Sequence, residues 1–120
     1  MKDNLIQAKS YAFALRIVNL YRWLCEEKKE YVLSKQILRS GTSIGANVEE
    51  AIGGQSGKDF HSRLSIAYKE SRETHYWLRL LHDSKLIDDN AYASIFADCE
   101  ELMKILGSIT KTMKKQLRDS

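Results

Sequence analysis

Residues 57–83 carry a seam of small and apolar side chains that constrains the fold more than any other feature of the sequence. Its members alternate between steps of four and three residues over three heptads. This interval returns side chains to one side of an α-helix, whereas a strand would repeat every second residue. The seam consists of Phe60, Leu64, Ala67, Ser71, Thr74, Leu78 and Leu81. The spacing predicts a long helix packed along another helix.

The distribution of proline and glycine extends this prediction to the whole chain. The 120 residues include no proline, and five of the six glycines lie between Gly41 and Gly57. Such a chain favours long, uninterrupted helices. Helical spacing recurs in three more segments, so we predict helices at about 4–28, 35–53, 57–83 and 89–117. With short connections, residues 1–120 are expected to form one all-α domain, an antiparallel up-down-up-down four-helix bundle.

The predicted first helix is apolar around much of its girth. Its middle part contains only three strongly polar residues, Arg16, Asn19 and Arg22. A helix of this kind is expected to have more than one neighbour. The residues that we expect on its buried face are Leu5, Ala8, Ala12, Leu15, Val18, Leu24 and Cys25.

The segment from Ser34 to Gly57 combines an apolar row with a polar one. The apolar row contains Ile37, Gly41, Ile44, Val48 and Ala51, and the polar row beside it contains Ser40, Ser43, Asn47 and Glu50. A glycine inside a helix costs about 1 kcal/mol relative to alanine, so Gly41 and Gly45 predict a close neighbour, expected to be another backbone. Ser34 is the expected N-cap of this helix, and Ser56 with Asp59 resembles a capping box for the next one.

Titratable residues show no catalytic or metal-binding pattern. His61, His75 and His82 share one helical column, but neighbours seven residues apart are about 10 Å apart along the axis, too far to share one ion. The Glu-x-x-His pair of di-iron bundles is absent, as are nucleophile elbows and phosphate-binding loops. We therefore expect no enzymatic activity, no metal and no cofactor. Packing is the preferred interpretation of the histidines.

The carboxylates of the third helix suggest a structural network. Glu70 and Glu73 share a helical row with Arg63 and Trp77, and this row borders the seam. We expect these side chains to meet the polar row of the Ser34–Gly57 segment, either within the bundle or in a neighbouring subunit.

Localisation follows from the N-terminus and the cysteines. The first residues alternate apolar and polar side chains, so they lack the apolar segment of a secretory signal. Cys25 and Cys99 are isolated, which is typical of small buried side chains in a reducing compartment. We expect a cytoplasmic protein without a membrane span.

A net charge of +3 permits an anionic partner without requiring one. Cations gather on one side of the fourth predicted helix, at Lys104, Lys111, Lys114, Lys115 and Arg118. They could follow a phosphate backbone, or they could be a solvated helix end favoured by the helix dipole. Arg16 and Arg22 are further candidates because Tyr21 and Trp23 lie beside them, although ordinary packing is the preferred interpretation there.

Two runs resemble a known family, L-S-K-Q-I-L-R-S-G-T-S-I-G-A-N-V-E-E-A at 33–51 and L-S-I-A-Y-K-E-S-R-E-T-H-Y-W-L-R-L-L at 64–81. They are similar to the bacterial four-helix-bundle proteins encoded in intervening sequences of 23S ribosomal RNA genes, and the resemblance covers nearly the whole chain. Ser71 departs from the alanine expected at its position. The positions that carry the signature are Gly41, Ser43, Ile44, Gly45, Asn47, Glu50, Ala51, Glu70, Glu73 and Trp77.

The resemblance implies a homopentameric ring of four-helix bundles with a basic surface for RNA or DNA. It also implies an alternative, because similar accessory proteins of diversity-generating retroelements bind a reverse transcriptase. No enzymatic activity follows from it. The leading hypothesis is a non-enzymatic, oligomeric, nucleic-acid-associated protein, and the alternative is a scaffold that recruits a partner protein.

Overall fold

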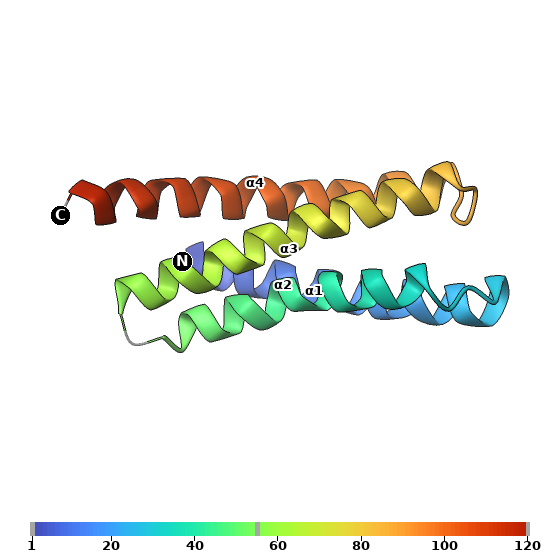
Figure 1. The fold of residues 1–120 in the computed structure, drawn as a ribbon, viewed down its shortest axis with the longest axis horizontal. Coiled ribbons are helices and arrows are strands. Elements are labelled where there is room, and N and C mark those ends of the chain that lie inside the picture. Colours follow the sequence, from blue (N-terminus) through green and yellow to red (C-terminus); the bar gives the residue numbers. More distant parts are fainter. Residues whose placement is uncertain (1, 55, 120) are drawn as a thin grey trace.

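The computed structural model describes residues 2–54 and 56–119. Four helices account for nearly all of them: α1 (Lys2–Lys28), α2 (Leu33–Ile52), α3 (Gly57–Asp83) and α4 (Asp89–Asp119). No strand occurs within the described ranges. Successive helices run in opposite directions along an elongated body of 51 × 24 × 21 Å (Figure 1). The predicted all-α four-helix bundle is confirmed.

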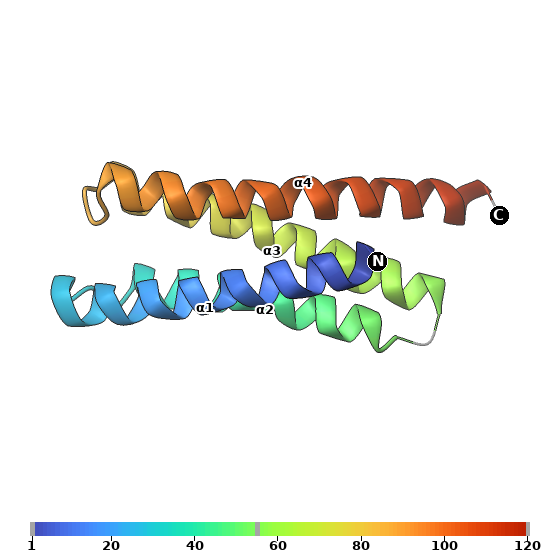
Figure 2. The ribbon, with the colours of Figure 1, turned by 180° about the vertical axis from the view of Figure 1, so that it is seen from behind.

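The four helices do not pack equally against one another. Contacts are extensive between α1 and α2, between α2 and α3 and between α3 and α4, but they are sparse between α1 and α4. Both views show that the last turns of α4 continue past the start of α1 (Figures 1 and 2). The C-terminal part of α4 therefore has fewer neighbours than the rest of the bundle. Across the described residues, none of the helices has an apolar stretch sufficient for a membrane span.

The predicted seams of α2 and α3 form the core. All five residues of the α2 apolar row are buried, and on α3 only Phe60 remains partly exposed. On α4 the buried residues are Ile95, Cys99, Leu102 and Leu106. Burial raises the pKa of the Cys99 thiol to about 12, so this cysteine stays protonated and behaves as a small apolar side chain. Cys25 is only half-buried.

The predicted buried face of α1 is largely wrong. Leu5, Ala8, Ala12 and Leu15 are exposed, whereas Leu24 is buried as expected and Val18 is half-buried. The core residues of α1 are Ile6, Phe13, Ile17 and Leu24. The prediction failed because α1 is apolar on several sides, so spacing alone does not decide which side faces the bundle.

The N-terminus of α2 is capped by Glu30 rather than by Ser34. The N-cap position is Val32, which provides no side-chain cap. The Glu30 carboxylate instead accepts hydrogen bonds from the amides of Val32 at 3.1 Å, Leu33 at 3.0 Å and Ser34 at 2.7 Å. Ser34 is buried and donates to the Glu30 carbonyl oxygen at 2.8 Å. Ser34 could not cap because the helix begins one residue before it, at Leu33.

The cap also sets the pKa of Glu30. Its partial burial alone would raise this pKa, but the hydrogen bonds from the amides of Leu33, Ser34 and Val32 outweigh burial and hold the pKa below its ordinary value. At the start of α3 the predicted cap is confirmed, because the Ser56 hydroxyl accepts from the Asp59 amide at 3.1 Å.

Gly41 and Gly45 allow α1 to lie close to α2. A Cβ on Gly45 would stand 3.3 Å from the carbonyl oxygen of Ser10, so the expected close backbone is present there. A Cβ on Gly41 would meet a side chain instead, 2.7 Å from Cγ1 of Ile17. Both glycines serve the α1–α2 contact.

Candidate nucleic-acid interface

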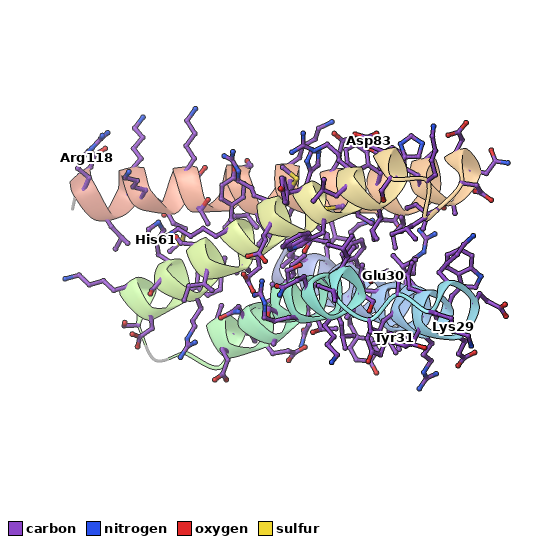
Figure 3. All side chains as sticks on the ribbon, turned by 45° about the vertical axis from the view of Figure 1, so that its right-hand side comes forward. Lys29, Glu30, Tyr31, His61, Asp83 and Arg118 are labelled. Carbon is purple, nitrogen blue, oxygen red and sulfur yellow. The ribbon has the colours of Figure 1, made fainter. Side chains whose placement is uncertain are left out.

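Five cations form a basic row on the outer side of α4, which we name the α4 stripe. Its members are Lys104, Lys111, Lys114, Lys115 and Arg118, and all five are exposed. At a rise of 1.5 Å per residue, the stripe is about 21 Å long. Figure 3 shows Arg118 at its far end, pointing away from the bundle.

The charges of the α4 stripe are nearly unopposed. Among the described side chains of residues 5–54 and 56–119, no carboxylate lies within 4.0 Å of its four lysine ammonium groups. Arg118 lies 3.5 Å from the carboxylate of its neighbour Asp119. Leu102 and Leu106 are buried on the opposite side of the same helix. The helix therefore turns an apolar side to the core and a cationic side to solvent.

The basic surface begins at Lys104 because carboxylates occupy the preceding turn. Glu101 forms an ion pair with Lys9 of α1 at 3.1 Å, and Glu100 lies 3.6 Å from Nε2 of His75 on α3. These acidic side chains contact Lys9 and His75 of neighbouring helices rather than the α4 stripe. The sequence pattern gave no sign of the Lys9–Glu101 contact, since it depends on which helices are neighbours.

Arg16 and Arg22, also predicted to bind nucleic acid, lie elsewhere. Arg16 pairs with Asp98 of α4 at 2.6 Å and donates to the Ser94 hydroxyl at 2.9 Å. It thereby ties α1 to α4. Arg22 is exposed further along α1, toward the α3–α4 turn and away from the stripe. The structure gathers the five α4 cations and leaves these two arginines apart.

The signature carboxylates of α3 form the expected network, but their cationic partner is Arg39 of α2 rather than Arg63. Arg39 donates to Glu70 at 3.3 Å and also to Glu73. Trp77 donates its indole N–H to Glu73 at 2.9 Å. Sequence reasoning missed Arg39, although it lies four residues before Ser43 and thus continues the polar row of α2.

The polar row of α2 reaches α3 at fewer places than expected. The buried hydroxyl of Ser40 accepts a hydrogen bond from Thr74 of α3 at 2.9 Å. The hydroxyl of Ser43 and the amide of Asn47 instead donate to carbonyl oxygens of their own helix. Glu50 shares a polar surface groove of about 600 Å³ with Arg63. The signature residues therefore serve helix packing and local hydrogen bonding.

The chain is similar to a known protein family over most of its length. The model of the 23S rRNA-intervening sequence protein family matches residues 2–108. The chain belongs to that family. No curated protein matches this chain.

A solved structure has the same fold. It is a crystal structure of a protein of unknown function from the S23 ribosomal protein family of Bacteroides thetaiotaomicron. The two sequences are 56% identical over 92% of this chain and 99% of that chain, and the TM-score is 0.90. The four-helix bundle is therefore shared with a protein of unknown function.

The family match ends before most of the α4 stripe. Lys104 lies inside residues 2–108, whereas Lys111, Lys114, Lys115 and Arg118 lie beyond them. The signature residues all lie inside the match. Membership of the 23S rRNA-intervening sequence protein family therefore accounts for the bundle, whereas most of the stripe lies outside the matched residues.

The three histidines have packing partners in the structure. His82 stacks on Tyr92 with ring centroids 4.0 Å apart and lies 2.7 Å from Asp89. His75 packs against Phe96, and His61 lies 3.5 Å from the Ser65 hydroxyl. Within the part of the chain that the structure describes, no three His, Cys, Asp or Glu side chains are arranged to hold a metal ion.

Proposed function

We propose that this protein is a non-enzymatic, oligomeric protein that binds nucleic acid through the α4 stripe. The observation that carries this proposal is the set of five exposed cations along about 21 Å of one helix, opposed only by Asp119 among the described residues. Clustered lysine and arginine on one face is the electrostatic footprint of phosphate binding. The proposal places the protein in the cytoplasm, with RNA as the preferred ligand class.

The helix dipole does not account for the stripe. Its stabilisation of cations falls off within the last turn of a helix. The last residue of α4 is Asp119, so Lys104 and Lys111 lie more than one turn before the end. Lys114 and Lys115 lie about one turn or more before the end, where the effect of the helix dipole has fallen off. A cationic side that continues over four turns therefore favours a ligand along the helix.

Assembly into a homo-oligomer, as the ring of the resembled family implies, is supported by the outer side of α1. Leu5, Tyr11 and Leu15 expose 50%, 64% and 52% of their surface. Ala8 and Ala12, between them on the same helix, are also exposed. Covering such a patch with another copy would remove apolar surface from water. An oligomer would also present several α4 stripes to one nucleic acid.

The alternative function, recruitment of a partner protein, is favoured by the groove between α1 and α4. This groove has a volume of about 440 Å³ and is lined by Leu20, Trp23, Ile87 and Ile95, with Arg16 at its edge. Trp23 is 40% exposed, and tryptophan is enriched at the centres of protein interfaces. A partner such as a reverse transcriptase could place an apolar side chain here.

A salt-dependent binding measurement with two matched variants tests the proposal. K104E/K111E/K115E reverses three charges of the α4 stripe, and K35E/K58E/K69E reverses three exposed lysines on α2 and α3. The first variant is expected to lose binding to structured RNA at low salt, and the second to retain most of it. Equal losses, or no binding by the wild-type protein, would refute a site on the stripe. A partner that remains bound in a pull-down after nuclease treatment would favour the scaffold.

A further inference from the structure

We infer that the α4 stripe binds the phosphate backbone of a double helix and does not read the bases of a single strand. This inference rests on the proposed function, and it specifies the form of nucleic acid. Three features of the stripe carry it: the residues between the cations, the shape of the surface around them and the rigidity of the helix beneath.

Between the cations, α4 itself has no aromatic residue on which unpaired bases could stack, and the half-buried Tyr68 of α3 packs against Gly107. Proteins that bind single strands stack successive bases on aromatic side chains. The aromatic residues of α4 are Tyr92 and Phe96, in its first turns, and residues 97–119 contain none. Tyr92 and Phe96 stack on each other with centroids 4.7 Å apart, and they also pack against His82 and His75. They are thus engaged in the α3–α4 contact, away from the cations.

The residue between the first two cations suits a phosphate instead. Ser108 lies one turn after Lys104 on the same side of α4, and its hydroxyl is exposed. A serine hydroxyl can donate to a phosphate oxygen, a contact that positions a duplex without reading its sequence. The stripe residues therefore supply ammonium, guanidinium and hydroxyl donors, and none of them is aromatic.

The stripe also lies apart from the described grooves. Single strands typically follow a positively charged groove. The described grooves lie between α1 and α4, between α1 and α2, between α2 and α3 and beside the α3–α4 turn, and the stripe residues line none of these. Side chains project outward from this end of α4 in Figure 3, where Arg118 marks its last turn. A row of outward-pointing cations can lie against a stiff backbone, whereas a flexible strand is better held by a groove.

The row is straight and fixed, which suits a ligand whose charges are already in place. Along the helix axis, Lys104, Lys111, Lys115 and Arg118 are separated by about 10.5, 6 and 4.5 Å. A duplex carries one phosphate per 1.7 Å of its axis and keeps this density without being ordered by the protein. Neutralising a duplex phosphate also releases more counterion than neutralising a single-strand phosphate, with salt slopes of about −0.9 and −0.7 per contact.

The test compares four ligands of one sequence by fluorescence anisotropy with the full-length protein: an RNA duplex and a DNA duplex of about 20 base pairs, and the two corresponding single strands. At 3.4 Å per base pair, such a duplex is longer than the stripe. At least one duplex is expected to bind about tenfold more tightly than either strand, with a scrambled sequence changing Kd by less than about threefold. For four contacts, duplex affinity should fall about 150-fold between 50 and 200 mM salt.

The outcomes separate this inference from the proposed function. Single strands that bind as tightly as the duplexes would overturn the inference and leave nucleic-acid binding intact. Absence of binding to all four ligands would overturn both. If one duplex binds more tightly than the other, the result identifies RNA or DNA as the preferred ligand and supports the inference. Duplex binding that K104E/K111E/K115E leaves unchanged would remove the stripe from the site, whereas a loss of about tenfold or more supports it.

Discussion

Gly41 of α2 faces Ile17 of α1 so closely that a Cβ on the glycine would stand 2.7 Å from Cγ1 and 2.8 Å from Cγ2 of the isoleucine. Ile17 is fully buried, and both contacted atoms are attached directly to its Cβ. Such atoms cannot move aside as the end of a long flexible side chain could. The distance between α1 and α2 is therefore set by the absence of a side chain at position 41.

Gly41→Ala is expected to destabilise the protein despite the better helix propensity of alanine. Propensity would contribute about 1 kcal/mol, whereas overpacking a rigid contact costs about 1 to 3 kcal/mol. We expect a net loss of about 1 kcal/mol, measured by urea denaturation. Gly57→Ala is the control, because nothing lies within 4 Å of a Cβ there. Equal or greater stability of Gly41→Ala would show that the two helices can separate at no cost.

Glu30→Gln is expected to weaken the start of α2 at neutral pH and to flatten the loss of stability in acid. The pKa of Glu30 is lowered in the folded protein, so its contribution is present above the ordinary carboxyl pKa of 4.5 and is lost as the pH falls through the lower folded value. Removing a cap costs about 1 kcal/mol. Denaturation of both proteins between neutral pH and acid below the ordinary carboxyl pKa measures this difference. Parallel stability curves would contradict the capping role.

Arg39→Leu should lower the free energy of unfolding by about 1 kcal/mol, because it leaves Glu70 and Glu73 without their cation. The loss stays moderate because the Arg39 side chain is 50% exposed and solvent screens the pair. Arg39→Lys is the matched variant. It keeps the charge but cannot place two N–H groups on two carboxylates, so we expect partial rescue. Full stability of Arg39→Leu would show that the network is dispensable.

Leu5→Lys combined with Leu15→Lys should dissociate the proposed oligomer without unfolding the bundle. Both side chains are exposed in the single chain, so the core is unaffected. Burial of a leucine contributes about 1.5 to 3 kcal/mol, so the pair should weaken association by at least about 100-fold. Light scattering at micromolar concentration measures the mass, and circular dichroism confirms the helices. Tyr76→Lys, on exposed α3 surface, serves as the control. An unchanged mass would exclude this side of α1 from the interface.

Arg16→Ala tests whether Arg16 of α1 contributes to nucleic-acid binding together with the α4 stripe. We expect a loss of less than about 1 kcal/mol in stability, since its ion pair with Asp98 is about half-exposed. Binding of nucleic acid should change less than it does in Lys111→Ala. The reverse order of the two effects in an anisotropy titration would place the ligand on α1.

Spacing predicted the helices well where the apolar stripe is narrow. The seams of α2 and α3 each leave polar residues on the other sides, so their inward faces could be read from the sequence. On α1 the same method selected Leu15, while the structure buries Ile17 two residues later. Apolar residues on several sides leave the choice to the packing of α2 and α4.

Contacts between helices were harder to predict than the helices themselves. The stripe cations share one helix, so their common side followed from spacing alone. The ion pair between Arg16 and Asp98, and the reach of Arg39 to two carboxylates, depend on the register between different helices. A single sequence does not specify that register.

The separation of the α4 stripe from the core also bears on how such a protein can diversify. The cations are exposed and lie mostly beyond residues 2–108 that match the family. Substitutions there change surface charge with little effect on buried contacts. Relatives could therefore gain, lose or exchange an anionic ligand through a few surface mutations, while the same bundle is inherited unchanged.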